Sequence, residues 1–325
     1  MSFLNILDSR DLCERAVSQT TKIRLEPEVQ RLSVDALAQL VDSQNERLEH
    51  TQRERLDAAR ELLGAELTMV ALGTLATTEL TNYCRERWSE GQHVVWPELK
   101  PVSPKAELLV EDMVVNSANT LAAIELLSVA GYETQARTIV RRLVELTELC
   151  LAALFDFQTL RHYANKSEDF DAIYDTWRRH LTPGTIRRVL QRYYVEVGLT
   201  NDELEDQRKS SDYDQRWLSL ASHNYFLSLA IEGQHTDVSV DQRFEFILDP
   251  THYLSAAATL RKACEVQANF LLVVQHLLMI KHGWKFKGPT PNRFMYYRAL
   301  FNCARQFCYD KGEEDQRLSE GSSDE

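Results

Sequence analysis

Residues 210–230 place an arginine and a histidine where they could do chemistry together. Arg216, Ser219, Leu220 and His223 follow the spacing i, i+3, i+4, i+7, so they share one face of a helix. The histidine could exchange a proton near neutral pH, and the arginine could stabilise a phosphate or its transition state. The competing interpretation is a histidine at the edge of the core whose hydrogen bonds are satisfied.

Residues 130–156 hold a second candidate pair. An apolar stripe at helical spacing runs through Ile139, Leu143, Leu146 and Cys150. At about 100° per residue, Arg142 lies roughly 80° from the centre of this stripe. Glu145 is the i+3 neighbour of Arg142, so the two side chains can meet. The functional interpretation is an arginine held at the edge of a cleft by a carboxylate, and the alternative is an ordinary surface ion pair.

A third candidate is a basic segment near the C-terminus. Residues 275–311 contain seven basic residues and one acidic residue, and residues 178–192 add five arginines. Aromatic side chains lie among these cations, a combination that suits RNA bases. The candidate nucleic-acid-binding residues are Lys281, Lys285, Lys287, Arg293, Tyr297 and Arg298. The alternative is a solvated face that balances the acidic segments elsewhere in the chain.

Two of these segments resemble a bacterial all-helical family of unknown function that is related to the HEPN (higher eukaryotes and prokaryotes nucleotide-binding) superfamily. In the first segment the matching residues are Ala130, Gly131, Ala136, Arg137, Arg142, Leu143 and Glu145; in the second they are Tyr213, Leu218, Ser219 and His223. The resemblance covers about residues 105–285. HEPN ribonucleases carry an Arg-x(4–6)-His motif, which Arg216 and His223 meet, although Arg87 and His93 meet it as well.

The resemblance implies metal-independent RNA cleavage. His223 would be the general acid or base, and Arg216, with Arg142, would stabilise the charged phosphorane. Such sites in HEPN proteins usually form at a dimer interface, and many relatives only bind. Trp217 stands where HEPN sequences often have a polar residue after the arginine, which argues against catalysis.

The elements that must position these residues are long helices. Gly and Pro together are 19 of 325 residues, about 6% where roughly 12% is usual, so turns are few. The apolar spacing predicts helices over about 52–88, 106–130, 133–157, 168–180, 183–197, 212–231, 250–282 and 290–309. Short-range signals predict some helix ends: Ser33 and Ser167 as caps, a capping box of Thr200 and Glu203, and Gly131 and Gly198 just after a helix. We therefore expect an all-α multi-helix bundle with an antiparallel helical core.

Composition shifts suggest three regions. We expect a helical N-terminal region over 1–104, a HEPN-like helical domain over 105–311 and a disordered acidic tail over 312–325. Proline-rich residues 89–105 supply the first boundary.

Net charge and motif content narrow the function classes. A net charge of -12 opposes non-specific nucleic-acid binding, so an RNA site would need a local basic patch. No phosphate-loop, dinucleotide, nucleophile-elbow or zinc signature occurs, so we expect no cofactor and no metal. Early charges exclude a signal peptide, and the apolar run over 270–280 is too short to span a bilayer, which favours a cytoplasmic protein.

Two functional hypotheses remain. The first is a HEPN-like effector, a toxin or other protein of bacterial stress or phage defence, that cleaves or binds RNA. The second is a non-catalytic helical protein-interaction module. The expected partners are RNA and a second copy or another protein, without a membrane.

Overall fold

The computed structural model of the chain describes residues 33–36, 39, 57–59, 61–90, 96, 108–164, 169–222, 236–237, 245–246 and 250–321. The chain divides into two compact units, Met1–Ala58 and Ala59–Glu325. In the first unit, Ser33 accepts a hydrogen bond from the Ala36 amide at 3.1 Å and so begins a short helical stretch, as its place in the sequence predicts.

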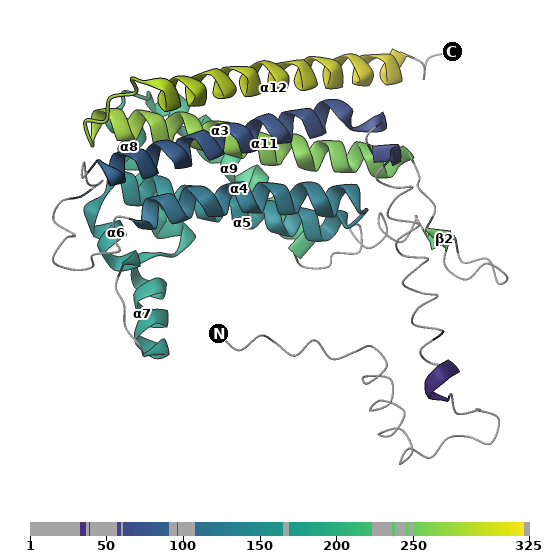
Figure 1. Cartoon of the computed structure of the whole chain (residues 1–325), viewed down its shortest axis with the longest axis horizontal. Coiled ribbons are helices and arrows are strands. Elements are labelled where there is room, and N and C mark those ends of the chain that lie inside the picture. Colours follow the sequence, from purple (N-terminus) through teal and green to yellow (C-terminus); the bar gives the residue numbers. More distant parts are fainter. Residues whose placement is uncertain are drawn as a thin grey trace. The chain divides into compact units, whose positions relative to one another are not determined.

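The second unit is built from helices, as Figure 1 shows. They are α3 (Gly64–Ser89), α4 (Leu108–Val129), α5 (Glu133–Phe155), α6 (Phe157–Tyr163), α7 (Phe170–His180), α8 (Pro183–Glu196), α9 (Asn201–Ser222), α11 (Pro250–Ile280) and α12 (Pro289–Gly321). Two-residue strands β1 (Thr236–Asp237) and β2 (Glu245–Phe246) form an antiparallel pair in which Thr236 is opposite Phe246. The expected all-α multi-helix fold is confirmed.

Helix α11 is the centre of this unit, because it packs against α3, α4, α5 and α12. Helix α5 contacts α4 and α11 and also carries α8 and α9, so that it links the central helices to the shorter ones. Its buried face runs through Ala136, Val140, Leu143, Cys150 and Leu154. This face is shifted from the predicted stripe, because Ile139 and Leu146 are only partly buried.

Local backbone chemistry explains where several helices begin and end. Gly131 and Gly198 have φ angles of 86° and 94°, the left-handed conformation that closes a helix, and they follow α4 and α8 as predicted. The side chain of Glu203 accepts from the Thr200 amide at 2.7 Å and the Thr200 hydroxyl accepts from the Glu203 amide at 3.3 Å. This capping box is the predicted one, but it begins α9 directly, about ten residues before the expected start at 212.

Two other helix boundaries differ from the predictions. Asp156 interrupts the expected helix 133–157, because its carboxylate accepts from the Thr159 amide at 2.8 Å and begins α6. Asp169, rather than residue 167, begins α7 and accepts from the Asp171 amide at 3.0 Å. In both cases an aspartate oxygen replaces the missing intrahelical acceptor at a helix start.

The second compact unit spans the predicted region 105–311 and part of the predicted N-terminal region 1–104. Helix α3 packs against α4, α11 and α12, so residues from Ala59 onward belong to the same compact unit as 105–311. At the other end α12 continues to Gly321, where a disordered tail was expected from residue 312.

The described residues include one helical segment, Ser255–Ile280 within α11, that is long and apolar enough for a membrane span by length and composition. Of its most apolar window, 56% is buried in the bundle, and a core helix of a globular protein meets the same criterion. The cytoplasmic location stays a prediction.

Candidate functional site

The predicted pair on α5 is arranged differently from the expectation. Glu145 accepts a hydrogen bond from Arg141, one turn earlier, at 3.2 Å, and both side chains are more than 40% exposed. Arg142 is exposed, and its charge lowers the pKa of Tyr163 on α6, a pKa that burial raises overall. Glu145 therefore forms a surface ion pair with Arg141 and not with Arg142, the partner that both interpretations expected.

By helical spacing, Arg142 and Arg216 each lie on a helix face turned away from the residues that join α5 to α9. The side of α5 that faces α9 carries Arg137, which contacts Trp217, and Val144 and Glu148, which line a pocket together with α9. Arg142 is about 120° from Glu148 around the helix. Arg216 is exposed on α9, about 160° from the buried Leu218.

The remaining members of the predicted catalytic set are only partly described. Ser219 is half-buried on α9, whereas His223 lies outside the described residues. The roles of His223, Arg216, Arg142 and Ser219 in RNA chemistry stay predictions.

Arg137 is one of the residues that match the HEPN-related family, but the resemblance implies no role for it. In the structure it lies at the centre of a buried ionic cluster. Its Nε lies 2.9 Å from Glu133, and its Nη2 donates to Ser255 of α11 at 2.5 Å. Thr259, also of α11, donates to the same Glu133 oxygen, and the Trp217 ring of α9 stacks on the Arg137 guanidinium. This cluster fastens α5 to α9 and α11, so we assign it a structural role.

The predicted nucleic-acid-binding residues are less available than their number suggests. Lys281 pairs with Glu196 and lies over the Phe155 ring, and Arg293 pairs with Glu79 at 3.0 Å. Burial lowers the pKa of Arg298, whose guanidinium lies over Phe294. Lys285 and Lys287 are exposed and have no ion pair among the described residues, whereas Tyr297 is half-buried. Nucleic-acid binding by the patch stays a prediction.

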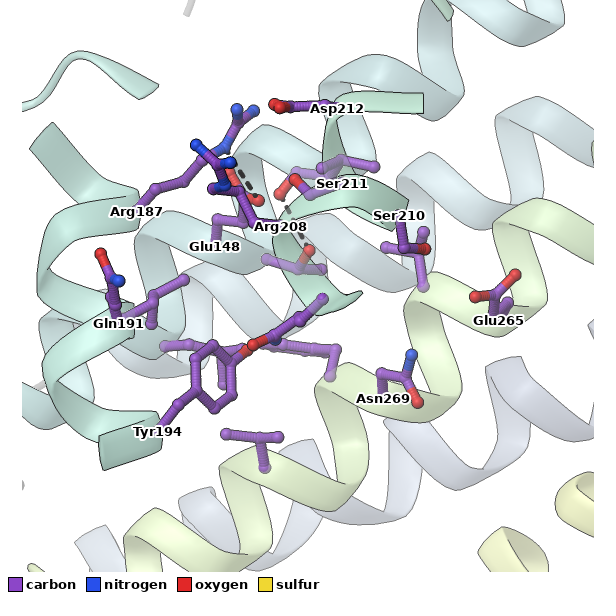
Figure 2. A pocket seen from close by; sticks show the side chains of 18 of the residues that line it. Glu148, Arg187, Gln191, Tyr194, Arg208, Ser210, Ser211, Asp212, Glu265 and Asn269 are labelled. Carbon is purple, nitrogen blue, oxygen red and sulfur yellow. Dashed lines mark hydrogen bonds and ion pairs between the residues drawn. The ribbon is translucent and has the colours of Figure 1, made fainter. Parts of the chain in front are cut away.

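A pocket of about 480 Å³ lies between α5, α8, α9 and α11. Figure 2 shows its polar lining: Glu148 from α5, Arg187, Gln191 and Tyr194 from α8, Arg208, Ser210, Ser211 and Asp212 from α9, and Glu265 and Asn269 from α11. Apolar side chains, among them Val144, Leu151 and Phe270, form the rest of the wall. A volume of this size is typical of small-molecule sites.

The centre of the pocket's electrostatics is the pair Glu148 and Arg187. The carboxylate Oε1 and the guanidinium Nε are 3.5 Å apart, long for a hydrogen bond, and the side chains are 18% and 26% exposed. Nε and Nη2 of Arg187 and Oε2 of Glu148 are buried without a hydrogen-bond partner among the described residues. Burial raises the pKa of Glu148, and the Arg187 charge only partly opposes it. Buried polar atoms in native proteins are nearly always paired, so this pair is incomplete.

The other cations that line the pocket differ in how they are held. Arg208 makes two hydrogen bonds to Glu205, and Lys262 lies 3.1 Å from Glu265. Arg188 instead donates to the Gly184 carbonyl and the Thr185 hydroxyl, both at 3.3 Å, and no carboxylate is bonded to it within the described segments. Its charge is therefore the least neutralised of the pocket cations.

The sequence contained little to indicate this pocket. Arg187 and Arg188 belong to the five arginines that make residues 178–192 basic. Glu148 looked like one more polar position of an amphipathic helix. Their distance along the chain concealed the contact, which exists only because α8 packs on α5.

No group of three or more His, Cys, Asp or Glu side chains that could hold a metal occurs in the described segments. Comparisons of the chain with family models, curated proteins and solved structures find no match.

Proposed function

We propose that this protein binds a small, anionic, polar molecule in the pocket between α5, α8, α9 and α11. The observation that carries the proposal is the incomplete pair Glu148–Arg187 at the wall of an open pocket. Arg187 Nε has only its 3.5 Å ion pair with Glu148 Oε1, and Arg187 Nη2 and Glu148 Oε2 are buried without a hydrogen-bond partner among the described residues. Leaving such atoms unpaired costs about 1–3 kcal/mol each. A ligand that supplies the missing partners would recover this cost.

The unpaired atoms specify the ligand's chemistry. Arg187 offers donors in a planar fork, which matches a carboxylate or a phosphate. Arg188 adds a second charge that no acid neutralises among the described residues. The free Oε2 of Glu148 requires a donor when ionised, such as a hydroxyl or an amino group. The ligand class is thus a compact molecule with an anionic group next to hydrogen-bond donors.

The volume and the remaining walls limit the ligand's size. A pocket of about 480 Å³ accommodates a molecule up to the size of a mononucleotide or a sugar phosphate. The apolar residues Val144, Leu151 and Phe270 would cover a ring or carbon skeleton, while Gln191 and Asn269 would meet its polar edge. We propose binding, without a reaction step, for this site.

The test is binding to a defined panel. Nucleoside monophosphates, sugar phosphates and dicarboxylates would be screened by thermal shift and then measured by calorimetry, so that phosphate and carboxylate are distinguished. Arg188→Gln should weaken binding of a hit about tenfold or more, because a charge-assisted hydrogen bond is lost. Arg187→Gln should weaken it further.

Arg192→Gln is the matched control, because Arg192 is on the same helix but pairs with Asp156 at 3.1 Å and does not line the pocket. It should bind like the wild type. Absence of any ligand from all three classes, or equal weakening by Arg188→Gln and Arg192→Gln, would refute the proposal.

RNA binding or cleavage, the function that the resemblance implies, is our second candidate. The observations in its favour are the exposed Arg216 on α9 and the accessible Lys285 and Lys287. The experiment is degradation of RNA by purified wild-type protein and by the His223→Ala variant. Equal degradation by both proteins, or degradation by neither, would remove the cleavage hypothesis.

A further inference from the structure

Helix α7 presents an apolar face to solvent. Phe170, Ile173, Tyr174 and Trp177 are 75%, 46%, 50% and 46% exposed. Their spacing i, i+3, i+4, i+7 puts them on one stripe, within about 100° of the helix circumference. No residue of α7 is buried. An amphipathic helix usually turns such a stripe toward a core, and an exposed contiguous apolar patch indicates a binding surface.

The charges beside the stripe are segregated along the helix. Taking Phe170 as the reference, Asp171 is about 100° and Arg178 about 80° around the helix, so both flank the stripe on the same side, two turns apart. Neither has an ion pair within the described part of the chain. On the face away from the stripe, about 140° and 180° from Phe170, Asp175 and Arg179 pair with each other at 3.0 Å. Among the described residues, the flank therefore has an acid without an ion pair at its N-terminal end and a base without one at its C-terminal end.

We propose that α7 is a self-association surface on which a second copy of the chain packs its own α7 in antiparallel orientation. A two-fold axis perpendicular to both helices leaves the charged flanks of the two copies on the same side of the interface. It also reverses the order of the residues along the flank of one copy relative to the other. Asp171 of each copy then faces Arg178 of the other, and the aromatic stripes cover each other, with Phe170 about 3 Å along the axis from the level of Trp177 of the other copy. A parallel pair would put the two Asp171 side chains at the same level and form neither ion pair.

The charge pattern favours a second copy over a lipid surface. Within 169–180 there are three aspartates and two arginines, so α7 has no net positive charge with which to bind anionic headgroups. Helices that lie in membrane interfaces are typically rich in Lys and Arg on the polar face. A surface that is complementary to itself is what an isologous contact requires.

The small area of the α7 surface limits the expected affinity of the dimer. One face of an eleven-residue helix is smaller than a standard interface of about 1,600 Å². The dimer should therefore be weak, with a dissociation constant of roughly 10 µM to 1 mM. This proposal is independent of ligand binding, because none of the α7 residues lines the pocket.

The test is sedimentation equilibrium of the full chain over a wide concentration range. Asp171→Arg and Arg178→Asp should each raise the dissociation constant at least about tenfold, because each places like charges opposite one another. A mixture of the two variants should form a heterodimer, since both contacts then join an arginine of one copy to an aspartate of the other. These substitutions lie on a helix that buries no side chain, so folding should not be affected.

Asp175→Arg is the matched control: it makes the same charge change on the side of α7 away from the stripe, and it should dimerise like the wild type. A chain that is monomeric at every concentration, or variants that do not associate when mixed, would overturn the proposal. It would also be overturned if the wild type stayed monomeric but bound phosphatidylcholine–phosphatidylglycerol vesicles through Trp177.

Discussion

The Trp217 ring of α9 stacks on the guanidinium of Arg137 from α5, with 4.6 Å between the arginine carbon and the ring centroid. The same guanidinium pairs with Glu133, whose side chain is only 5% exposed. A charged pair this deeply buried needs additional partners, and Ser255 and Thr259 supply them at Arg137 and at Oε1 of Glu133. Oε2 of Glu133 has no hydrogen-bond partner among the described residues. The tryptophan thus completes the enclosure of a structural ion pair.

Arg137→Met should destabilise the protein strongly. It removes the partner of Glu133 and leaves a buried carboxylate without a counter-charge, a change that typically costs about 3–5 kcal/mol. The measurement is the free energy of unfolding by chemical denaturation.

Two further variants separate charge from packing. Glu133→Gln combined with Arg137→Met removes both charges, so much of the lost stability should return. Arg141→Met removes an exposed cation from the same helix and should change stability by less than about 0.5 kcal/mol. If Arg137→Met were as mild as Arg141→Met, the structural role of the cluster would be wrong.

Helix ends could be predicted from the sequence where one or two residue types determine the backbone conformation. Gly131, Gly198 and the Thr200–Glu203 box were identified from the sequence, because left-handed glycines and capping boxes depend on a few adjacent residues. Asp156 was missed, because it lies in a continuous apolar pattern in which an aspartate looks like a solvent-facing helical position. Asp156 caps α6 because its backbone leaves the helical conformation, and the apolar pattern does not show where this happens.

Glu148 should make stability depend on pH in the direction opposite to an ordinary ion-paired acid. Burial raises its pKa above the ordinary value near 4.5, so the native state holds the proton more tightly than the unfolded chain does. The free energy of unfolding therefore falls as pH rises from about 4.5 through the raised native pKa. Glu148→Gln, which cannot ionise, should be more stable than the wild type at neutral pH.

The advantage of Glu148→Gln should disappear as pH falls toward 4.5, where the wild type is protonated in both states. Unfolding curves of the two proteins at several pH values test this. A Gln variant that is less stable at pH 7 would mean that the attraction to Arg187 outweighs the burial of Glu148. In that case the Glu148–Arg187 pair would not be incomplete, and the proposed ligand site would lose its main support.

His162 and His180 should give a second pH response. Their rings stack at 3.8 Å with 2° between planes, and this contact joins the end of α6 to the end of α7. Burial lowers the pKa of His162, the charges of His180 and Arg161 lower it further, and Asp156 opposes them. Because the native state holds this proton less tightly, its contribution to stability is complete above about pH 6.5 and is lost as pH falls.

Titration of the His162 ring proton by NMR measures this pKa directly. It should lie below 6.5 in the wild type and should rise in His180→Asn, where one neighbouring charge is gone. A wild-type value at or above 6.5 would contradict the stacked arrangement, as would no change in the variant.

The candidate site was less predictable than the helices for a physical reason. Spacing along one helix predicts that Arg142 and Glu145 are neighbours, yet Glu145 pairs with Arg141, four residues before it. Glu148 and Arg187 meet because two helices pack at one particular angle and depth. Only the tertiary contact distinguishes these charged residues from the many solvent-exposed ones.

Gly73 allows α3 to approach its neighbours closely, and Gly73→Ala should therefore be destabilising. A Cβ at this position would lie 2.9 Å from the Phe301 ring and 3.3 Å from Leu121, and both side chains are fully buried. Overpacking of this kind costs about 1–3 kcal/mol, whereas alanine gains about 1 kcal/mol in helix propensity. We expect a net loss of roughly 1 kcal/mol in the free energy of unfolding.

Gly64→Ala is the control, because nothing lies within 4 Å of its Cβ position and it should be neutral or slightly stabilising. Equal unfolding free energies for the two variants would show that Phe301 moves aside without cost.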